Sequence, residues 1–296
     1  MKSIKENQLT NKTIYFLMIL AMLSWGIAWT NAKLLNEYLN YYNLVFLRFL
    51  FGFLSILPFT LKKIKLIKNI SNKSFINILS MGVLFFIYNY CFFKGTDLGK
   101  SGMGGVFVTT TNPLITLIII TIINKELKLN HLFGIVLGVI GGLVILDVFN
   151  LGISYLVDLK NIYFIFCSLI WGLMTVIMSY GQKEVDSVLY IMICYFCTTI
   201  ISIFFISTNE LFQLDIFNLK FLINFFLVSI GAMSFGTSIY IFSTPRLGPV
   251  KSSVFIFSVP FIAMSTAYFV LEEAITINII LGGLLSILAI YIVNKK

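Results

Sequence analysis

Residues 13–31 read TIYFLMILAMLSWGIAWTN, a run of 19 residues without a charged side chain. A transmembrane α-helix needs about 20 mostly apolar residues to cross the hydrocarbon core of a bilayer. Lys2, Lys5 and Lys12 precede the run, and the residues that follow it (30–33, TNAK) lack the small-residue cleavage site of a secretory signal peptide. The stretch therefore predicts an uncleaved first membrane span.

The rest of the chain repeats this character. Of its 296 residues, 59% are hydrophobic and 11% are charged, with a mean hydropathy of +0.98, whereas a soluble domain carries about 25% charged residues. This composition excludes a disordered chain, a coiled coil and a soluble enzyme with one core. The apolar runs are continuous and do not alternate as barrel strands do. We predict an all-α polytopic membrane protein with ten transmembrane helices, near residues 13–31, 42–60, 74–94, 102–123, 131–147, 161–180, 187–206, 221–243, 250–271 and 275–293.

The positive charges indicate the orientation, because cytoplasmic loops of membrane proteins are enriched in Lys and Arg. With a cytoplasmic N-terminus, fifteen Lys and Arg residues fall inside, five fall outside, and Arg48 lies within the second span. Both termini are therefore predicted to be cytoplasmic, in the cell (inner) membrane. The chain carries a net charge of +9. We interpret the lysine cluster of residues 62–73 as a topology anchor near anionic lipid, and we predict no nucleic-acid partner. The inside set is Lys2, Lys5, Lys12, Lys62, Lys63, Lys65, Lys68, Lys73, Lys125, Lys128, Lys183, Arg246, Lys251, Lys295 and Lys296; the outside set is Lys33, Lys94, Lys100, Lys160 and Lys220.

Five short matches recur in order at offsets of 146 to 149 residues. They are Trp25-Gly26 with Trp171-Gly172, Leu98-Gly99 with Leu247-Gly248, Pro113 with Pro260, Glu126 with Glu273, and Gly134 with Gly282. They predict a duplicated unit of five spans, residues 1–147 and 161–296, joined by an external linker, residues 148–160. Because five is odd, the second copy is predicted to be inverted in the membrane, an architecture of transporters whose site lies between the copies.

The same residues resemble the EamA-type carriers of the drug/metabolite transporter superfamily over nearly the whole chain. The resemblance rests on the Trp-Gly, Pro, Glu and Gly matches above, together with Leu23-Ser24 before the first Trp-Gly pair, Leu47-Arg48-Phe49 in the second span, Glu272, and Gly283. It implies ten helices, a central cavity between the halves, and export of small metabolites or amino acids.

Arg48 is the strongest single candidate for a functional residue. It lies about seven residues into its span, which puts it about 10 Å below the outer surface. A charged residue at this depth is costly and commonly functional, although a long side chain can instead reach the headgroups. For Lys94, at the outer end of the third span, reaching the headgroups is the preferred interpretation.

Other candidates are polar or aromatic side chains inside the spans. Pro113 and Pro260 remove a backbone hydrogen bond at matching places and are predicted hinges beside the substrate path, although each can be a kink supported by neighbouring helices. Trp25 and Trp171 either stack around substrate or only pack. The predicted substrate-binding set is Trp25, Arg48, Asn89, Thr110, Asn112, Trp171 and Thr237.

We predict a secondary transporter, not an enzyme, that exports small metabolites such as amino acids or related compounds by alternating access, without a cofactor or a bound metal. A cationic Arg among aromatic rings and hydroxyls suits an anionic or zwitterionic substrate. An intramembrane enzyme acting on lipid or polyprenyl substrates is the alternative, and a passive channel is a third. Small residues at Gly134, Gly138, Gly142, Gly282 and Ser286 predict close helix packing, in a monomer or a homodimer.

Overall fold

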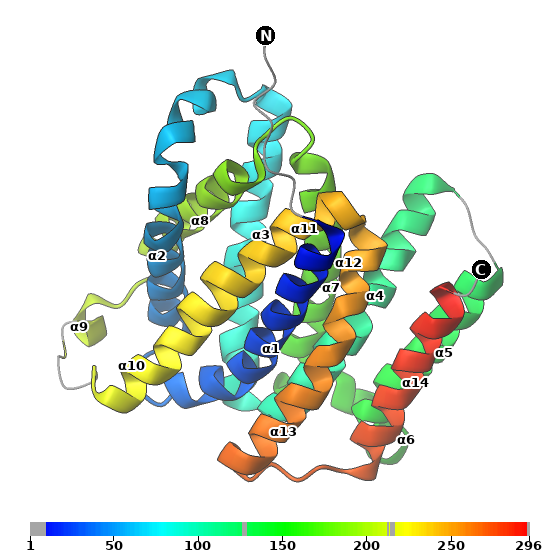
Figure 1. Ribbon diagram of the computed structural model, residues 1–296. Helices are drawn as coiled ribbons and strands as arrows, with labels where there is room; N and C mark the ends of the chain where they lie inside the picture. The colour runs from blue at the N-terminus through cyan, green and yellow to red at the C-terminus, as the bar shows by residue number, and fades with distance from the viewer. Residues whose placement is uncertain (1–9, 126–128, 212, 214–216, 295–296) are drawn as a thin grey trace.

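A computed structural model describes residues 10–125, 129–211, 213 and 217–294 (Figure 1). Glu126, Lys128 and the terminal lysines Lys2, Lys5, Lys295 and Lys296 lie outside the described residues. In the described part every regular element is helical. The first copy holds α1 (Asn11–Leu35), α2 (Tyr41–Thr60), η1 (Leu61–Asn69), α3 (Asn72–Leu98), α4 (Ser101–Asn124) and α5 (Leu129–Ile145).

The linker and the second copy make up the rest of the described chain. The linker contains α6 (Val148–Leu151) and η2 (Ile153–Val157). The second copy holds α7 (Leu159–Gly181), α8 (Ser187–Ile203), α9 (Thr208–Leu211), α10 (Leu219–Phe226), η4 (Leu227–Thr237), α11 (Ser238–Leu247), α12 (Pro249–Phe255), η5 (Ile256–Ser258), α13 (Val259–Leu271) and α14 (Ile277–Asn294).

Among the described residues, seven helical stretches are long and apolar enough to cross a membrane: Asn11–Leu35, Tyr41–Asn69, Asn72–Leu98, Ser101–Asn124, Leu159–Gly181, Leu219–Leu247 and Pro249–Leu271. Three shorter apolar helices, Leu129–Ile145, Ser187–Ile203 and Ile277–Ala289, correspond to the remaining three predicted spans. The chain is therefore a multi-pass membrane protein.

Short polar side chains begin these helices, as helix N-termini require. The Asn40 side chain accepts hydrogen bonds from the second and third residues of α2, and Asp186, 146 residues later, does the same for α8. Ser71 caps α3, and Asn218, 147 residues later, caps α10. The two copies thus begin equivalent helices with equivalent side chains, although these positions were not among the recurring matches of the sequence.

Helices that are equivalent in the two copies also pair with each other. α2 packs against α8, α4 against α13, and α5 against α14. In Figure 1, α2 and α8 lie at one edge of the bundle, α5 and α14 at the opposite edge, and α1 and α7 between them. The pseudo-two-fold relation between the copies therefore passes through these three pairs.

The glycines of the two Trp-Gly pairs permit close packing. A Cβ added at Gly172 of α7 would lie 2.5 Å from the Cβ of Ile115 on α4. In the other copy, Gly26 of α1 meets Ile262 of α13 in the same way. Each isoleucine stands two residues after the proline of its own copy. The small-residue stripe of α5 is also used within the chain, since Gly141 contacts Gly282 and Ser286 of α14 and Gly138 and Gly142 face α4.

The copies differ where helices approach the middle of the bundle. α3 is one continuous α-helix, whereas its counterpart is interrupted by the π-helical segment η4. α4 stays α-helical through Pro113, whereas its counterpart has the 3₁₀ turn η5 directly before Val259 and Pro260. Hydroxyls of Thr109 and Thr110 bond to carbonyls one turn back beside Pro113. These bonds satisfy the two hydroxyls inside the helix; the carbonyl that Pro113 leaves without its N–H donor is that of Thr109.

Candidate functional site

A small cavity of about 40 Å³ lies between the two copies. Trp25 of α1 and Trp171 of α7 meet beside it, with ring centroids 4.9 Å apart in an edge-to-face arrangement. Ligand pockets commonly measure about 300–1,000 Å³, so the cavity is too small in this conformation for most metabolites. Its lining residues are Trp25, Ala28, Trp29, Arg48, Tyr88, Phe92, Thr109, Asn112, Trp171, Ala232 and Thr237.

Five of the seven predicted substrate-binding residues are in this lining: Trp25, Arg48, Asn112, Trp171 and Thr237. The sixth, Asn89, lies behind it and holds Arg48, because its Oδ1 accepts a hydrogen bond of 2.7 Å from the guanidinium. The seventh, Thr110, is not among the lining residues and donates its hydroxyl to backbone carbonyls of α4. Sequence reasoning missed Thr109, although its position three residues before Asn112 is the spacing of one helix face.

Arg48 is buried, with 6% of its surface exposed. Its guanidinium carbon lies 5.2 Å and 5.7 Å from the ring centroids of Phe92 and Phe93, and no ion pair joins it to a carboxylate in the described part of the chain. The side chain is therefore enclosed by protein, which favours a role inside the bundle over snorkelling. A cation over aromatic rings gains about 0.5–2 kcal/mol, which is far less than an unpaired buried charge costs.

Three buried polar atoms around the cavity have no hydrogen-bond partner: Arg48 Nε, Trp171 Nε1 and Asn112 Oδ1. Arg48 and Trp171 supply N–H donors, and Asn112 supplies an acceptor. Each buried polar atom without a partner costs about 1–3 kcal/mol. A small polar ligand that both accepts and donates hydrogen bonds would satisfy all three.

The two tryptophans differ in their hydrogen bonding. Trp25 Nε1 donates to the carbonyl oxygen of Ala232 on η4, at 3.0 Å, whereas Trp171 Nε1 lies near the Tyr240 hydroxyl without a hydrogen bond of good geometry. Thr237 donates to the same Ala232 oxygen across five residues, as a π-helix allows. π-helical geometry inside α-helices is rare and frequent at functional sites; here the 11-residue segment η4 presents a carbonyl to the cavity wall.

The sequence suggested that Lys94 extends to the headgroups, whereas in the structure its side chain lies among three tyrosine rings. It is half-buried, and its Nζ lies 5.1, 5.4 and 5.2 Å from the ring centroids of Tyr41, Tyr90 and Tyr163. Nζ also donates to the Tyr90 hydroxyl at 3.0 Å. The rings come from α2, α3 and α7, so this lysine joins both copies near the predicted outer end of the bundle.

A family model described as the EamA-like transporter family matches residues 12–147 and 159–295. The chain belongs to the EamA-like transporter family. The two matched segments are two copies of the family unit, and the family is one of membrane transporters, so it lends no support to the alternative of a lipid-modifying enzyme.

One solved crystal structure is similar to this EamA-like chain in fold. It shares 15% sequence identity with it, at a TM-score of 0.68, and the alignment covers 96% of this chain and 97% of the other. At that identity the likeness shows the fold alone. No curated protein matches the chain by sequence.

In this EamA-like chain Glu273 joins the ends of two helices at the predicted outer face. Its Oε1 accepts hydrogen bonds from the backbone N–H and hydroxyl of Ser101, and its Oε2 accepts one from the N–H of Gly102. The carboxylate thus caps the N-terminus of α4 from the end of α13, where negative charge is favoured.

We expect Glu273→Leu to lower the free energy of unfolding by about 1–2 kcal/mol, because the first turn of α4 loses its acceptor. Thermal unfolding of the purified protein measures this, with Asp97→Leu at an exposed carboxylate near the end of α3 as the control. Equal unfolding temperatures for the two variants would contradict the capping role.

Proposed function

We propose that this protein is a secondary carrier of the cell (inner) membrane that exports small metabolites, such as amino acids or related compounds, by alternating access. Its ten apolar helical stretches would all span the bilayer, with both termini in the cytoplasm. Residues 1–147 and 161–296 would be inverted copies that rock about the cavity between them, and residues 148–160 an external linker.

The inverted arrangement is supported by chain arithmetic and by charge. Five spans per copy place the second copy upside down relative to the first, and the Lys and Arg residues concentrate on one predicted face. Matched contacts such as Gly26 with Ile262 and Gly172 with Ile115 are also the contacts that two copies of one unit make.

The observation that carries the proposal is the set of unpartnered polar atoms in the cavity. Arg48 Nε and Trp171 Nε1 suit a carboxylate, while Asn112 Oδ1 and the tryptophan faces suit an ammonium group. A zwitterion offers both groups. Export follows from the resemblance of the chain to exporting carriers, and the site itself carries no direction.

The size of the cavity supports the mechanism. About 40 Å³ does not admit an amino acid, so helices around the cavity must separate at one face to load the site and at the other to empty it. Repeats that rock about a fixed central site accomplish this exchange.

The experiment compares metabolites in the growth medium of cells producing wild type, Asn112→Leu and the control Asn209→Leu at matched membrane levels. Asn209 is exposed and far along the chain from the cavity lining. We expect one or a few zwitterionic or anionic metabolites to accumulate outside with wild type and control, and about tenfold less with Asn112→Leu, since loss of a hydrogen bond to a charged group costs about 1.5–3 kcal/mol. Accumulation inside the cells would indicate import, and identical media under varied nutrient loads would contradict a carrier.

A further inference from the structure

The antiparallel pair of α2 and α8 is fastened at both of its ends. At the predicted outer end, the backbone N–H and the Nδ2 of Asn40 donate to Oε2 of Glu210, at 3.1 and 2.6 Å. Asn43 Nδ2 donates to the same carboxylate oxygen. Asn40 precedes α2, and Glu210 follows α8, so this outer clamp joins the start of one helix to the segment after the other.

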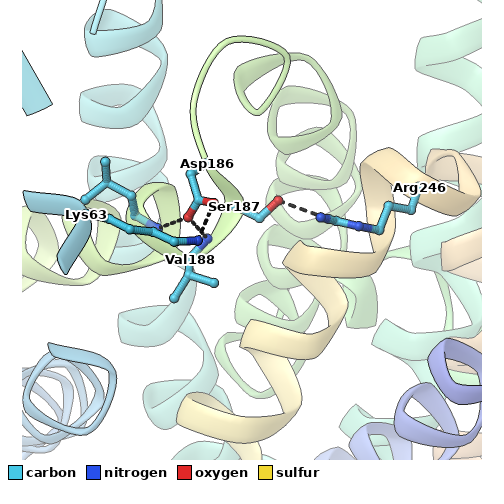
Figure 2. Close-up of polar contacts among 6 residues, drawn as sticks. Lys63, Asp186, Ser187, Val188 and Arg246 are labelled. Carbon is cyan, nitrogen blue, oxygen red and sulfur yellow. Dashed lines mark hydrogen bonds and ion pairs between the residues drawn. The ribbon is translucent and has the colours of Figure 1, made fainter. Parts of the chain in front are cut away.

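At the predicted cytoplasmic end, Lys63 Nζ lies 2.6 Å from Oδ2 of Asp186 (Figure 2). The other oxygen of Asp186 accepts hydrogen bonds from the N–H groups of Val188 and Leu189. Asp186 precedes α8, and Lys63 follows α2. The outer clamp joins the start of α2 to the segment after α8. This inner clamp joins the start of α8 to the segment after α2, so the two helices have exchanged their roles.

The two clamps are copies of one contact. Asn40 and Asp186 are 146 residues apart, and Lys63 and Glu210 are 147 apart, which are the offsets of the recurring sequence matches. At the outer end the helix-capping residue is the amide Asn40, and its partner is the carboxylate Glu210. At the inner end the capping residue is the carboxylate Asp186, and its partner is the ammonium group of Lys63. The chemistry has changed while donor and acceptor remain complementary at each end.

A second matched contact lies beside each clamp. Ser74 donates its hydroxyl to Glu184 at the inner end, as does Ser71, and these two bonds hold the pKa of Glu184 below its ordinary value. The positions equivalent to Glu184 and Ser74 are Tyr38 and Phe221, whose rings pack edge to face 5.7 Å apart at the outer end. The residues just before α2 and just before α8 are therefore held a second time at each face, by α10 outside and by α3 inside.

Symmetry decides which contacts must change during transport. In a carrier built of inverted copies, the inward-open and outward-open states arise when the two copies exchange conformations. A contact that the pseudo-two-fold maps onto an equivalent contact is present in both states. Equivalent elements that differ in conformation must instead exchange their shapes. One example is α4, which is a continuous helix, while its counterpart is divided into α12, η5 and α13.

We propose that the α2–α8 pair is the static axis of the transport cycle, held at both faces throughout by the outer and inner clamps, while the helices around α4 and α13 move. The inference rests on the proposed carrier function. It also assigns a role to Arg48, which α2 carries: the cation stays in place, and the moving helices open the cavity to one face and then to the other.

The test is cross-linking in a background whose four cysteines are replaced by serine or alanine. Asn40→Cys with Glu210→Cys reports the outer clamp, Lys63→Cys with Asp186→Cys reports the inner clamp, and Ser101→Cys with Glu273→Cys is the matched pair across α4 and α13. A short bifunctional methanethiosulfonate joins each pair, and export of the metabolite is measured before and after.

We expect cross-linked clamp pairs, singly or together, to retain at least about half of the export of the uncross-linked proteins. The α4–α13 pair should lose more than about tenfold, since α4 and α13 have counterparts of different shape and a fixed link between them blocks the exchange of those shapes. Loss of export in the clamp pairs comparable to that in the α4–α13 pair would overturn the static axis. Absence of export in the wild type itself would instead overturn the carrier function.

A second variant tests the clamps without cross-linking. Lys63→Glu alone faces the Asp186 carboxylate and should reduce the unfolding temperature. Lys63→Glu with Asp186→Asn places the side chains of the outer clamp at the inner position. This double variant should restore the unfolding temperature to within a few degrees of the wild-type value. Spin labels at the three cysteine pairs add a readout that needs no transport: one narrow distance at each clamp and two distances across α4 and α13. Two distances at either clamp, or failure of the copied clamp to restore stability, would contradict the proposal.

Discussion

Replacement of Arg48 by methionine is expected to reduce transport about 100-fold while leaving the protein at least as stable as the wild type. The guanidinium is buried, bonds only to Asn89 through one nitrogen, and has no carboxylate partner in the described part of the chain. Removing a buried charge in favour of an apolar side chain of similar length relieves a desolvation cost. A residue kept for structure alone would show the opposite, a fall in stability.

The transport assay separates charge from shape. If Arg48 binds the anionic group of the substrate, Arg48→Met should reduce export about 100-fold, equivalent to about 2.7 kcal/mol. Arg48→Lys keeps the charge but loses the planar donor pair, and is expected to retain a measurable part of the activity with a raised KM. Export by Arg48→Met at the wild-type rate would remove Arg48 from the site.

The parts of the fold that the sequence predicted well are those that depend on local amino-acid composition. Long apolar runs mark the helices because each must satisfy its own backbone in lipid, and the ten predicted spans all coincide with helical segments of the described chain. The Trp-Gly pairs indicated duplication, and Trp25 and Trp171 do meet between the copies. Membership of the EamA-like family was correctly inferred from these residues.

The parts that sequence did not predict depend on which face of a helix turns inward. Thr110 was chosen and Thr109 lines the cavity, because neighbouring positions on a helix point about 100° apart and α4 is apolar around nearly its whole circumference, so hydropathy does not mark its inner face. The π-helical segment before Thr237 and the tyrosine rings around Lys94 arise from tertiary packing. No periodicity in the sequence indicates them.

The burial of Arg48 and the clamps of α2 and α8 have a common physical consequence. A charge in the membrane is held by a single hydrogen bond to Asn89 and by aromatic rings, so its position depends on the rigidity of the helix that carries it. Ties at both ends of α2 supply that rigidity. The moving helices can then change the access to the charge without moving the charge itself.

The second large effect is expected at the glycines of the Trp-Gly pairs. Gly172→Ala places a methyl group 2.5 Å from the Cβ of Ile115 and 3.3 Å from the carbonyl oxygen of Asn112, and it pushes α7 away from α4 beside the cavity. Overpacking of this kind costs about 1–3 kcal/mol, so the unfolding temperature of a chain of this length should fall by about 2–5 °C. Export should fall with it, because Trp171 and Asn112 both line the cavity.

Double mutants show whether the duplication determines this packing. Ile115→Ala makes room for the added methyl, so Gly172→Ala with Ile115→Ala should lose less stability than the sum of the two single changes. The crossed combination, Gly172→Ala with Ile262→Ala, joins residues that do not touch, and its losses should simply add. Gly26→Ala should reverse the pattern, coupling to Ile262 and not to Ile115. Equal coupling in all four combinations would mean that the glycines act through general helix propensity. Selective coupling would show that each copy fastens its first helix to the other copy through one glycine and one isoleucine, at the point where the two tryptophans meet.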